Sequence, residues 1–340
     1  MALKTFEIPK DLNASLPAEY RNGSRDQVKM MVTEAGETTF TSFKNLSDYV
    51  QPGDVLIFNN TRTIPASLKV EWKDKIIEIR LSQQIDNLIW EGIVLKENVN
   101  IGDRLIVSSN LTFAVMGQGS EAPLLQLESG LNTQETIMEI LSVGEPIRYD
   151  YIYQPFPINT YQTVYGSVPG SMEMPSAGRA FTWQIINTLK EKGAKVGFVQ
   201  LFTGLSYYEK DRWPNPSNHP ERFCVSKEVA DLVNQAKRKG NRVIAVGTTV
   251  VRALESAGKL GDVVEKNNEY TDLYVNERYE RKVVDSLLTG LHEPEASHLD
   301  MLTSWLSKDE ITALYHEAIE RQFLWHEFGD LHLILGDDPS

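Results

Sequence analysis

The two threonines that follow Gly247 are the feature of this chain best suited to holding a ligand. Residues 243–246 form a β-branched, apolar run typical of a buried strand, and a helical pattern begins directly after the threonines. A strand that turns into a helix in this way presents hydroxyls and free backbone N–H groups at one point, where ligands bind in open α/β sheets. The alternative is an ordinary turn in which Thr248 or Thr249 caps the helix.

Two arginines lie close to predicted strand ends. Arg252, one turn into the helix, either meets a ligand or pairs with Glu255. The segment Asn59-Asn-Thr-Arg62 follows a predicted buried strand at residues 55–58, in a loop that can meet a ligand. The guanidinium of Arg62 is suited to binding a carboxylate or phosphate. The alternative is an arginine that bridges two parts of the fold.

Small residues precede a predicted amphipathic helix at residues 182–192. Ser176-Ala-Gly178 allows close approach of the backbone, and a helix start whose first turn includes Thr182 favours an anionic group. The alternative is a plain tight turn.

Two further segments carry groups that exchange protons or stack on rings. His292 lies in a loop between Gly290 and Pro294, where an imidazole can exchange protons near neutral pH, although a lone histidine is more often structural. The aromatic segment 325–330 suits either a stacking platform or a packing corner, and Asp330 is its best functional candidate.

The order of the predicted elements divides the chain into two parts. Residues 1–65 and 151–340 alternate between strand and helix patterns, which predicts one discontinuous α/β domain. Residues 66–150 hold short alternating strands separated by turns, which predicts an inserted, small antiparallel β-barrel. The predicted fold class is therefore α/β with an inserted barrel.

Composition excludes several classes of protein. The 340 residues carry a formal net charge of −13, which argues against indiscriminate nucleic-acid binding but permits a local basic patch. The single cysteine, Cys224, forms no internal disulfide, and no Cys/His cluster has zinc spacing. The chain shows neither a signal-peptide pattern nor a membrane-length apolar run, so we expect a soluble cytoplasmic protein.

Several blocks together resemble one enzyme family, the S-adenosylmethionine:tRNA ribosyltransferase-isomerases of queuosine biosynthesis. Their order and spacing are more specific than any one of them, and they span nearly the whole chain. The blocks are Pro52-Gly-Asp-Val-Leu-Ile-Phe-Asn-Asn-Thr-Arg-Thr-Ile-Pro-Ala66, Tyr161-Gln-Thr-Val-Tyr165, Pro175-Ser-Ala-Gly-Arg-Ala-Phe-Thr182, Val246-Gly-Thr-Thr-Val-Val-Arg-Ala-Leu-Glu255, Thr271-Asp-Leu273, Asp285-Ser-Leu-Leu-Thr-Gly-Leu-His-Glu-Pro294 and Gly329-Asp-Leu-His-Leu-Ile-Leu335.

The resemblance implies an α/β domain with an inserted barrel, and an unusual reaction. The ribosyl part of S-adenosylmethionine is transferred to the aminomethyl group of a 7-deazaguanine at the tRNA wobble position, and an epoxide-bearing carbocycle forms. Adenine and methionine leave. Such a reaction needs a base for the methylene beside the sulfonium, a proton donor for adenine and fixed dipoles in a dry site, but no metal.

The resemblance also implies roles for individual residues. The expected catalytic residues are His292, Glu221 and Asp330, with Glu221 in a motif that places His219 two residues earlier. The expected S-adenosylmethionine-binding residues are Asn59, Thr61, Arg62, Ser176, Ala177, Gly178, Thr182, Gly204, Gly247, Thr248, Thr249 and Arg252.

The chain departs from the family pattern where ionisable groups are usual. Arg179-Ala180 replaces a Leu-His step, while Phe202 and Pro216 stand where the pattern has histidines. Glu295 replaces an arginine. These changes indicate a divergent member and leave three alternatives: the tRNA-modifying enzyme, an S-adenosylmethionine enzyme acting on a small molecule, and a catalytically silent protein of this fold.

Overall fold

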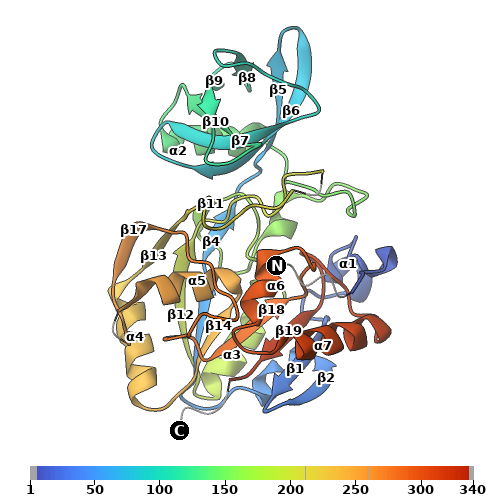
Figure 1. Ribbon diagram of the computed structural model, residues 1–340, viewed down its shortest axis with the longest axis vertical. Coiled ribbons are helices and arrows are strands. Elements are labelled where there is room, and N and C mark those ends of the chain that lie inside the picture. Colours follow the sequence, from blue (N-terminus) through green and yellow to red (C-terminus); the bar gives the residue numbers. More distant parts are fainter. Residues whose placement is uncertain (1–5, 211, 260, 337–340) are drawn as a thin grey trace.

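A computed structural model describes residues 6–210, 212–259 and 261–336 of the chain. A mixed α/β body carries a separate closed antiparallel barrel, which stands at one end of the molecule (Figure 1). The predicted fold class is therefore confirmed.

A nine-stranded sheet forms the centre of the body. Strands β12, β3, β14 and β18 run parallel to one another. β13 joins β12 antiparallel on one side of this group, and β19 joins β18 antiparallel on the other. The parallel strands therefore end at one common edge, as ligand sites in α/β sheets require. In spatial order the strands are β17 (Lys266–Thr271), β13 (Glu221–Val225), β12 (Lys195–Leu201), β3 (Val55–Asn59), β14 (Val243–Val246), β18 (Ser286–Gly290), β19 (Leu331–Ile334), β1 (Lys29–Glu34) and β2 (Glu37–Ser42).

Both faces of this sheet are covered, because successive side chains of each strand point to opposite sides. In β3, Val55 and Ile57 belong to one hydrophobic core, while Leu56 and Phe58 belong to the other. The first core contains α4 (Lys227–Arg238), α5 (Thr248–Ala257), α6 (Ser297–Leu302) and α7 (Lys308–Glu320). The second contains α3 (Trp183–Glu191) and the 3-10 helix η2 (Phe43–Asp48).

The barrel is built entirely from residues between 66 and 150 and has its own core. Its strands, in order of pairing, are β10 (Leu125–Ser129), β7 (Ile89–Leu95), β6 (Lys75–Gln84), β5 (Ser67–Trp72), β8 (Arg104–Ile106) and β9 (Thr112–Gln118). Helix α2 (Thr133–Val143) follows β10 and begins with a capping box at Asn132 and Glu135. The sequence patterns did not predict β10 or α2. The exact domain boundaries stay a prediction.

Short elements complete the body. They are η1 (Lys10–Leu12), α1 (Ala18–Asn22), β4 (Thr61–Thr63), η3 (Ile158–Tyr161), β11 (Val168–Ser171), η4 (Ser176–Gly178), β15 (Gly258–Lys259) and β16 (Asp262–Val263). β4 pairs with β11, and β15 pairs with β16. Among the residues described, no helix is both long and apolar enough to cross a membrane.

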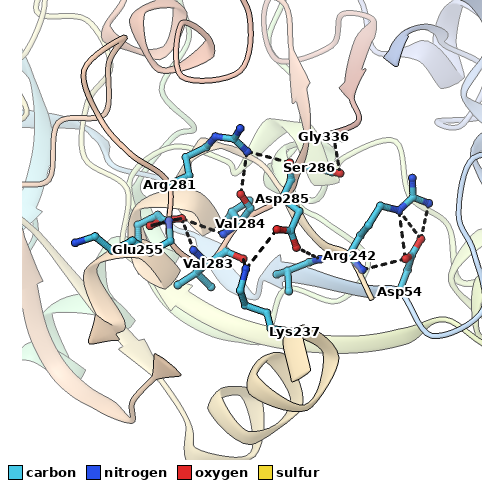
Figure 2. A network of polar contacts seen from close by, with 12 residues as sticks. Asp54, Lys237, Arg242, Glu255, Arg281, Val283, Val284, Asp285, Ser286 and Gly336 are labelled. Carbon is cyan, nitrogen blue, oxygen red and sulfur yellow. Dashed lines mark hydrogen bonds and ion pairs between the residues drawn. The ribbon is translucent and has the colours of Figure 1, made fainter. Parts of the chain in front are cut away.

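Glu255 explains why one predicted strand begins late. Residues 282–288 read as a strand, yet β18 begins only at Ser286. The carboxylate of Glu255 accepts the N–H groups of Lys282, Val283 and Val284 at 3.0, 3.0 and 2.9 Å, so these groups cannot join the sheet (Figure 2). The sequence also predicts helix caps at Ser226 and Ser307, which each precede a helical pattern, and both residues cap their helices, α4 and α7.

Candidate active site

A cavity opens at the carboxyl ends of β12, β14 and β18. Its walls come from the loops that follow these three strands, from the segment before and within η4, and from the loop that precedes β19. Because β19 runs antiparallel to β18, the loop before β19 lies beside the loop after β18. Segments far apart in sequence thus surround one hollow.

The start of α5 forms one wall of the cavity. Gly247, with a φ of 98°, is the N-cap residue, so neither threonine caps the helix. Thr248 and Thr249 occupy the first two helical positions, whose N–H groups have no carbonyl partner within an α-helix, whereas Val250 and Val251 donate to the Gly247 oxygen. Within the described part of the chain, the buried hydroxyl of Thr249 has no hydrogen-bond partner. This wall therefore offers donors to an anionic or polar ligand.

Arg252 and Glu221 form an ion pair in the cavity wall. Arg252 also donates to the backbone oxygens of Thr271 and Leu273, at 3.0 and 3.1 Å. The other oxygen of Glu221 accepts the N–H of Gly204 at 2.9 Å. The alternative pairing of Arg252 with Glu255 is wrong, because Glu255 binds the backbone before β18. The charge of Arg252 is thus largely neutralised before any ligand arrives.

Two imidazoles lie together in the wall, His292 in the loop after β18 and His298 in the first turn of α6. His292 and His298 stack with ring centroids 5.2 Å apart, and Nε2 of His292 forms a 2.7 Å hydrogen bond with the Thr289 hydroxyl. Burial, with a smaller contribution from His298, lowers the pKa of His292 to about 3. His292 is therefore neutral at physiological pH, and the expected proton exchange near neutral pH needs correction. In this state it accepts or donates a hydrogen bond.

A third histidine of the cavity wall, His326, forms an ion pair with a carboxylate. His326 Nδ1 lies 2.7 Å from Glu293 Oε1, and its ring stacks on Tyr151 at 3.9 Å. Burial alone would raise the pKa of Glu293, but the hydrogen bond and charge of His326 lower it to about 2. The phenol of Tyr151 donates to Glu327 at 2.6 Å.

Glu173 is a further carboxyl group in the cavity wall. Its Oε1 accepts hydrogen bonds from the Tyr149 hydroxyl and from the Ser206 N–H, the latter at 3.0 Å. Burial raises the pKa of Glu173 to about 7, although both hydrogen bonds act in the opposite direction.

His219 ties the cavity to the barrel. Its Nε2 lies 3.3 Å from the Ser82 hydroxyl, and its Nδ1 lies 3.1 Å from the Gln83 amide nitrogen. Both partners belong to β6 of the barrel. Burial lowers the pKa of His219. The barrel thus supports the loop that leads into Glu221.

Comparison with known proteins identifies the kind of site. The sequence profile described as "Queuosine biosynthesis protein" matches residues 3–334. The chain belongs to this family. S-adenosylmethionine:tRNA ribosyltransferase-isomerase of Carboxydothermus hydrogenoformans is 33% identical over 345 residues, covering 98% of this chain and 100% of the relative. The enzyme of the same name from Sulfurihydrogenibium sp. is 30% identical and covers 97% and 98% of the two chains.

A solved structure supports the same membership. S-adenosylmethionine tRNA ribosyltransferase of Thermotoga maritima is 27% identical to this chain, with a TM-score of 0.56. The likeness covers 98% of this chain and all of that one. The α/β body and barrel are therefore shared with a member of the queuosine biosynthesis family.

Most residues expected from the family resemblance surround the cavity, although their roles stay predictions. Those in its wall are Ser176, Ala177, Gly204, Glu221, Gly247, Thr248, Thr249, Arg252 and His292.

The residues at the end of β3 do not line the cavity. The amide of buried Asn59 donates to Leu201 O at 2.8 Å, and its oxygen accepts the Thr61 hydroxyl at 3.0 Å. Arg62 is exposed, and its nearest hydrogen bond is to Gly166 O at 3.4 Å. Asn59 and Thr61 thus clamp β3 to β12, and Arg62 faces solvent, while their expected contact with S-adenosylmethionine stays a prediction.

Two residues near η4 also have structural roles. Gly178 must lack a side chain, because an added Cβ would lie 1.8 Å from the Tyr165 hydroxyl. Thr182 caps α3 by accepting the N–H of Ile185 at 3.2 Å. Neither residue is among those that line the cavity, and their expected ligand contact stays a prediction.

Asp330 lies away from the cavity, in a different surface pocket. Its two oxygens accept the N–H groups of Lys29 and Leu324, at 2.7 and 2.8 Å. Asp330 therefore joins the start of β1 to the loop before β19, and its expected catalytic role stays a prediction that this position does not support.

Sequence reasoning missed several groups in the wall. Glu173 lies three residues before the small-residue segment that begins at Ser176, and His326 and Glu327 belong to the aromatic segment that drew attention to Asp330 instead. No periodic pattern distinguishes them, because loop side chains follow neither the strand nor the helix period. Among the described residues, no group of three or more His, Cys, Asp or Glu is arranged to hold a metal ion.

Proposed function

We propose that this protein transfers and isomerises the ribosyl part of S-adenosylmethionine onto the 7-aminomethyl-7-deazaguanine of tRNA. The product is epoxyqueuosine in tRNA, with adenine and methionine released. Family membership over almost the whole chain supports this proposal. The enzyme would act in the cytoplasm on a tRNA that carries the modified base at its wobble position.

One feature of the cavity carries the proposal. The helix start with its unpartnered Thr249 hydroxyl lies in the same hollow as four glutamates. S-adenosylmethionine combines a carboxylate with an ammonium and a sulfonium group. A helix start suits the carboxylate, and carboxylates suit the two cations.

The residues present also fit the demands of the reaction. Neutral His292 and the first turn of α5 offer fixed dipoles, which stabilise developing charge without rearrangement. The His326 imidazolium, whose pKa is raised by Glu293 despite its burial, is held between Glu293 and the Asn13 side-chain oxygen, so it fixes a positive charge in the cavity wall. We expect that no metal takes part in these steps.

Adenine release tests the proposal directly. The protein is incubated with S-adenosylmethionine and tRNA that carries the 7-aminomethyl-7-deazaguanine, and adenine and the modified nucleoside are measured. The matched control is the same tRNA with unmodified guanine at the wobble position.

The proposal expects adenine only with the modified tRNA. Adenine release with a small amine in place of tRNA would instead support a small-molecule acceptor. If the protein neither binds S-adenosylmethionine nor releases adenine, it is a catalytically silent protein of this fold.

A further inference from the structure

The four carboxyl groups of the cavity fall into two kinds. Glu221 and Glu293 each have a cationic partner, Arg252 and His326 respectively. Glu173 and Glu327 instead accept hydrogen bonds from the phenols of Tyr149 and Tyr151 respectively, which lie where the chain leaves the barrel. Glu173 also accepts the N–H of Ser206. When these two groups ionise, the cavity carries negative charge that its own side chains leave unbalanced. Such a cavity favours a cationic ligand.

Glu173 is held from three directions. Its backbone oxygen accepts the Thr203 hydroxyl at 2.6 Å, and its Oε1 accepts the N–H of Ser206 and the hydroxyl of Tyr149. Thr203 and Ser206 belong to the loop after β12, whereas Tyr149 lies where the chain leaves the barrel. The carboxyl group is therefore fixed in position, as a group that acts on a reacting atom must be.

The chemistry of Glu173 suits proton abstraction. Its pKa, raised by burial to about 7, matches the range in which a general base is both ionised and basic enough at neutral pH. A cation placed beside the carboxyl group favours its ionised form. Arrival of a positively charged substrate would thus prepare the base.

We propose that Glu173 faces the sulfonium centre of bound S-adenosylmethionine and removes a proton from the methylene beside it. This rests on the proposed function. One C–H bond breaks, its electron pair stays on the carbon next to sulfur, and the proton forms an O–H bond on Glu173. No oxidant, reductant or metal takes part in this step.

The other groups of the cavity are less suited to this role. His292, with a pKa near 3, is a weak base, and Glu293, with a pKa near 2, is already paired with His326. Glu221 is bound to Arg252. Glu327 is the rival, because burial raises its pKa as well. The experiment must therefore compare Glu173 with Glu327.

The test uses the full chain with S-adenosylmethionine and modified tRNA. Adenine release and the entry of deuterium from D₂O into the 5′ methylene are measured for Glu173→Gln and Glu327→Gln. The affinity of each variant for S-adenosylmethionine is then compared with its affinity for the neutral thioether S-adenosylhomocysteine. Exposed Glu71 on the barrel supplies the matched control, Glu71→Gln, for which we expect unchanged activity.

For Glu173→Gln we expect adenine release and deuterium entry to fall by about 10²- to 10⁴-fold, the usual contribution of a general base. Binding of S-adenosylmethionine should weaken several-fold while binding of the thioether is kept, because only the former has the sulfonium charge. Glu173→Asp should restore part of the turnover.

The pH profile gives a readout that a structural role would not move. The rate should rise with pH through the pKa of Glu173, near 7. Because the Tyr149 hydrogen bond lowers that pKa, Tyr149→Phe should move the rise to higher pH. Tyr149→Phe tests the assignment of Glu173 as the base even if Glu173→Gln fails to fold.

Two results would overturn the assignment. One is deuterium entry that survives in Glu173→Gln but is lost in Glu327→Gln, which would make Glu327 the base. The other is a pH profile that Tyr149→Phe leaves in place. A wild-type protein that does not bind S-adenosylmethionine would instead reject the proposed function, and this inference with it.

Discussion

The two ends of the parallel strands both carry many charged groups, but they satisfy them differently. At the amino ends, Arg242 contacts Asp54 at 2.7 Å, and Asp285 pairs with Lys237 at 3.3 Å and accepts the Val243 N–H at 2.8 Å (Figure 2). At the carboxyl ends lie an unpartnered hydroxyl and carboxyl groups whose pKa values burial raises.

The difference separates structural charge from functional charge. Buried ions that bind each other and the backbone are already satisfied, so a ligand would gain little by joining them. Groups that folding leaves incompletely satisfied gain from a ligand that completes them. The number of charged residues alone does not distinguish the two ends.

Asp54→Ala should give the largest effect. It leaves the buried Arg242 guanidinium with only the exposed carboxylate of Glu34, at 3.9 Å, as a charged partner, and loss of a buried partner typically costs about 3–5 kcal/mol of unfolding free energy. Urea denaturation measures this loss. The control is Asp231→Ala, which breaks the exposed pair with Lys227 and should cost only about 0.5 kcal/mol. Equal losses in the two variants would contradict the distinction between buried and exposed pairs.

The pH dependence of stability should depend on His332, which is fully buried in the core. Burial lowers its pKa from 6.5 to about 3. Between these values the unfolded chain binds a proton that the folded chain does not, so stability falls as pH drops from about 6.5 towards 3. His332→Gln should make this decline less steep.

Denaturation at a series of acidic pH values measures that slope. Exposed His316 provides the control, since His316→Gln should leave the slope as it is. A decline equally steep in wild type and His332→Gln would show that His332 does not stay neutral in the core.

Thr249→Val should give the smallest effect, and it should separate a loss of ligand binding from a loss of stability. The substitution keeps the shape of the side chain and removes a hydroxyl that has no partner within the described residues. Binding of S-adenosylmethionine should weaken about 2- to 12-fold, the loss of one hydrogen bond, while the unfolding free energy does not fall.

Calorimetry and urea denaturation of the same protein sample separate these two quantities. Exposed Thr39 in β2 is the matched control, and Thr39→Val should change neither. A loss of stability with unchanged binding would assign the Thr249 hydroxyl to the fold rather than to a ligand.

The sequence alone predicted the parts of the fold that depend on local pattern. The alternating residues 67–72 predict a strand, and Ser226 and Ser307 predict the starts of two helices. β5, α4 and α7 confirm these predictions. Alternating side chains and capping residues act over a few positions, so their effect is visible in the chain itself. The barrel and the α/β body followed from these patterns, and the family resemblance reinforced them.

Only the tertiary structure decided which groups meet. It paired Arg252 with Glu221 rather than Glu255, brought Glu173 and Glu327 into the cavity, and moved Asp330 out of it. The physical reason is that strand order sets contacts between residues far apart in the chain, and burial then sets their pKa values. The sequence determined the elements and the family, while the meeting of distant loops at one edge of the sheet created the site.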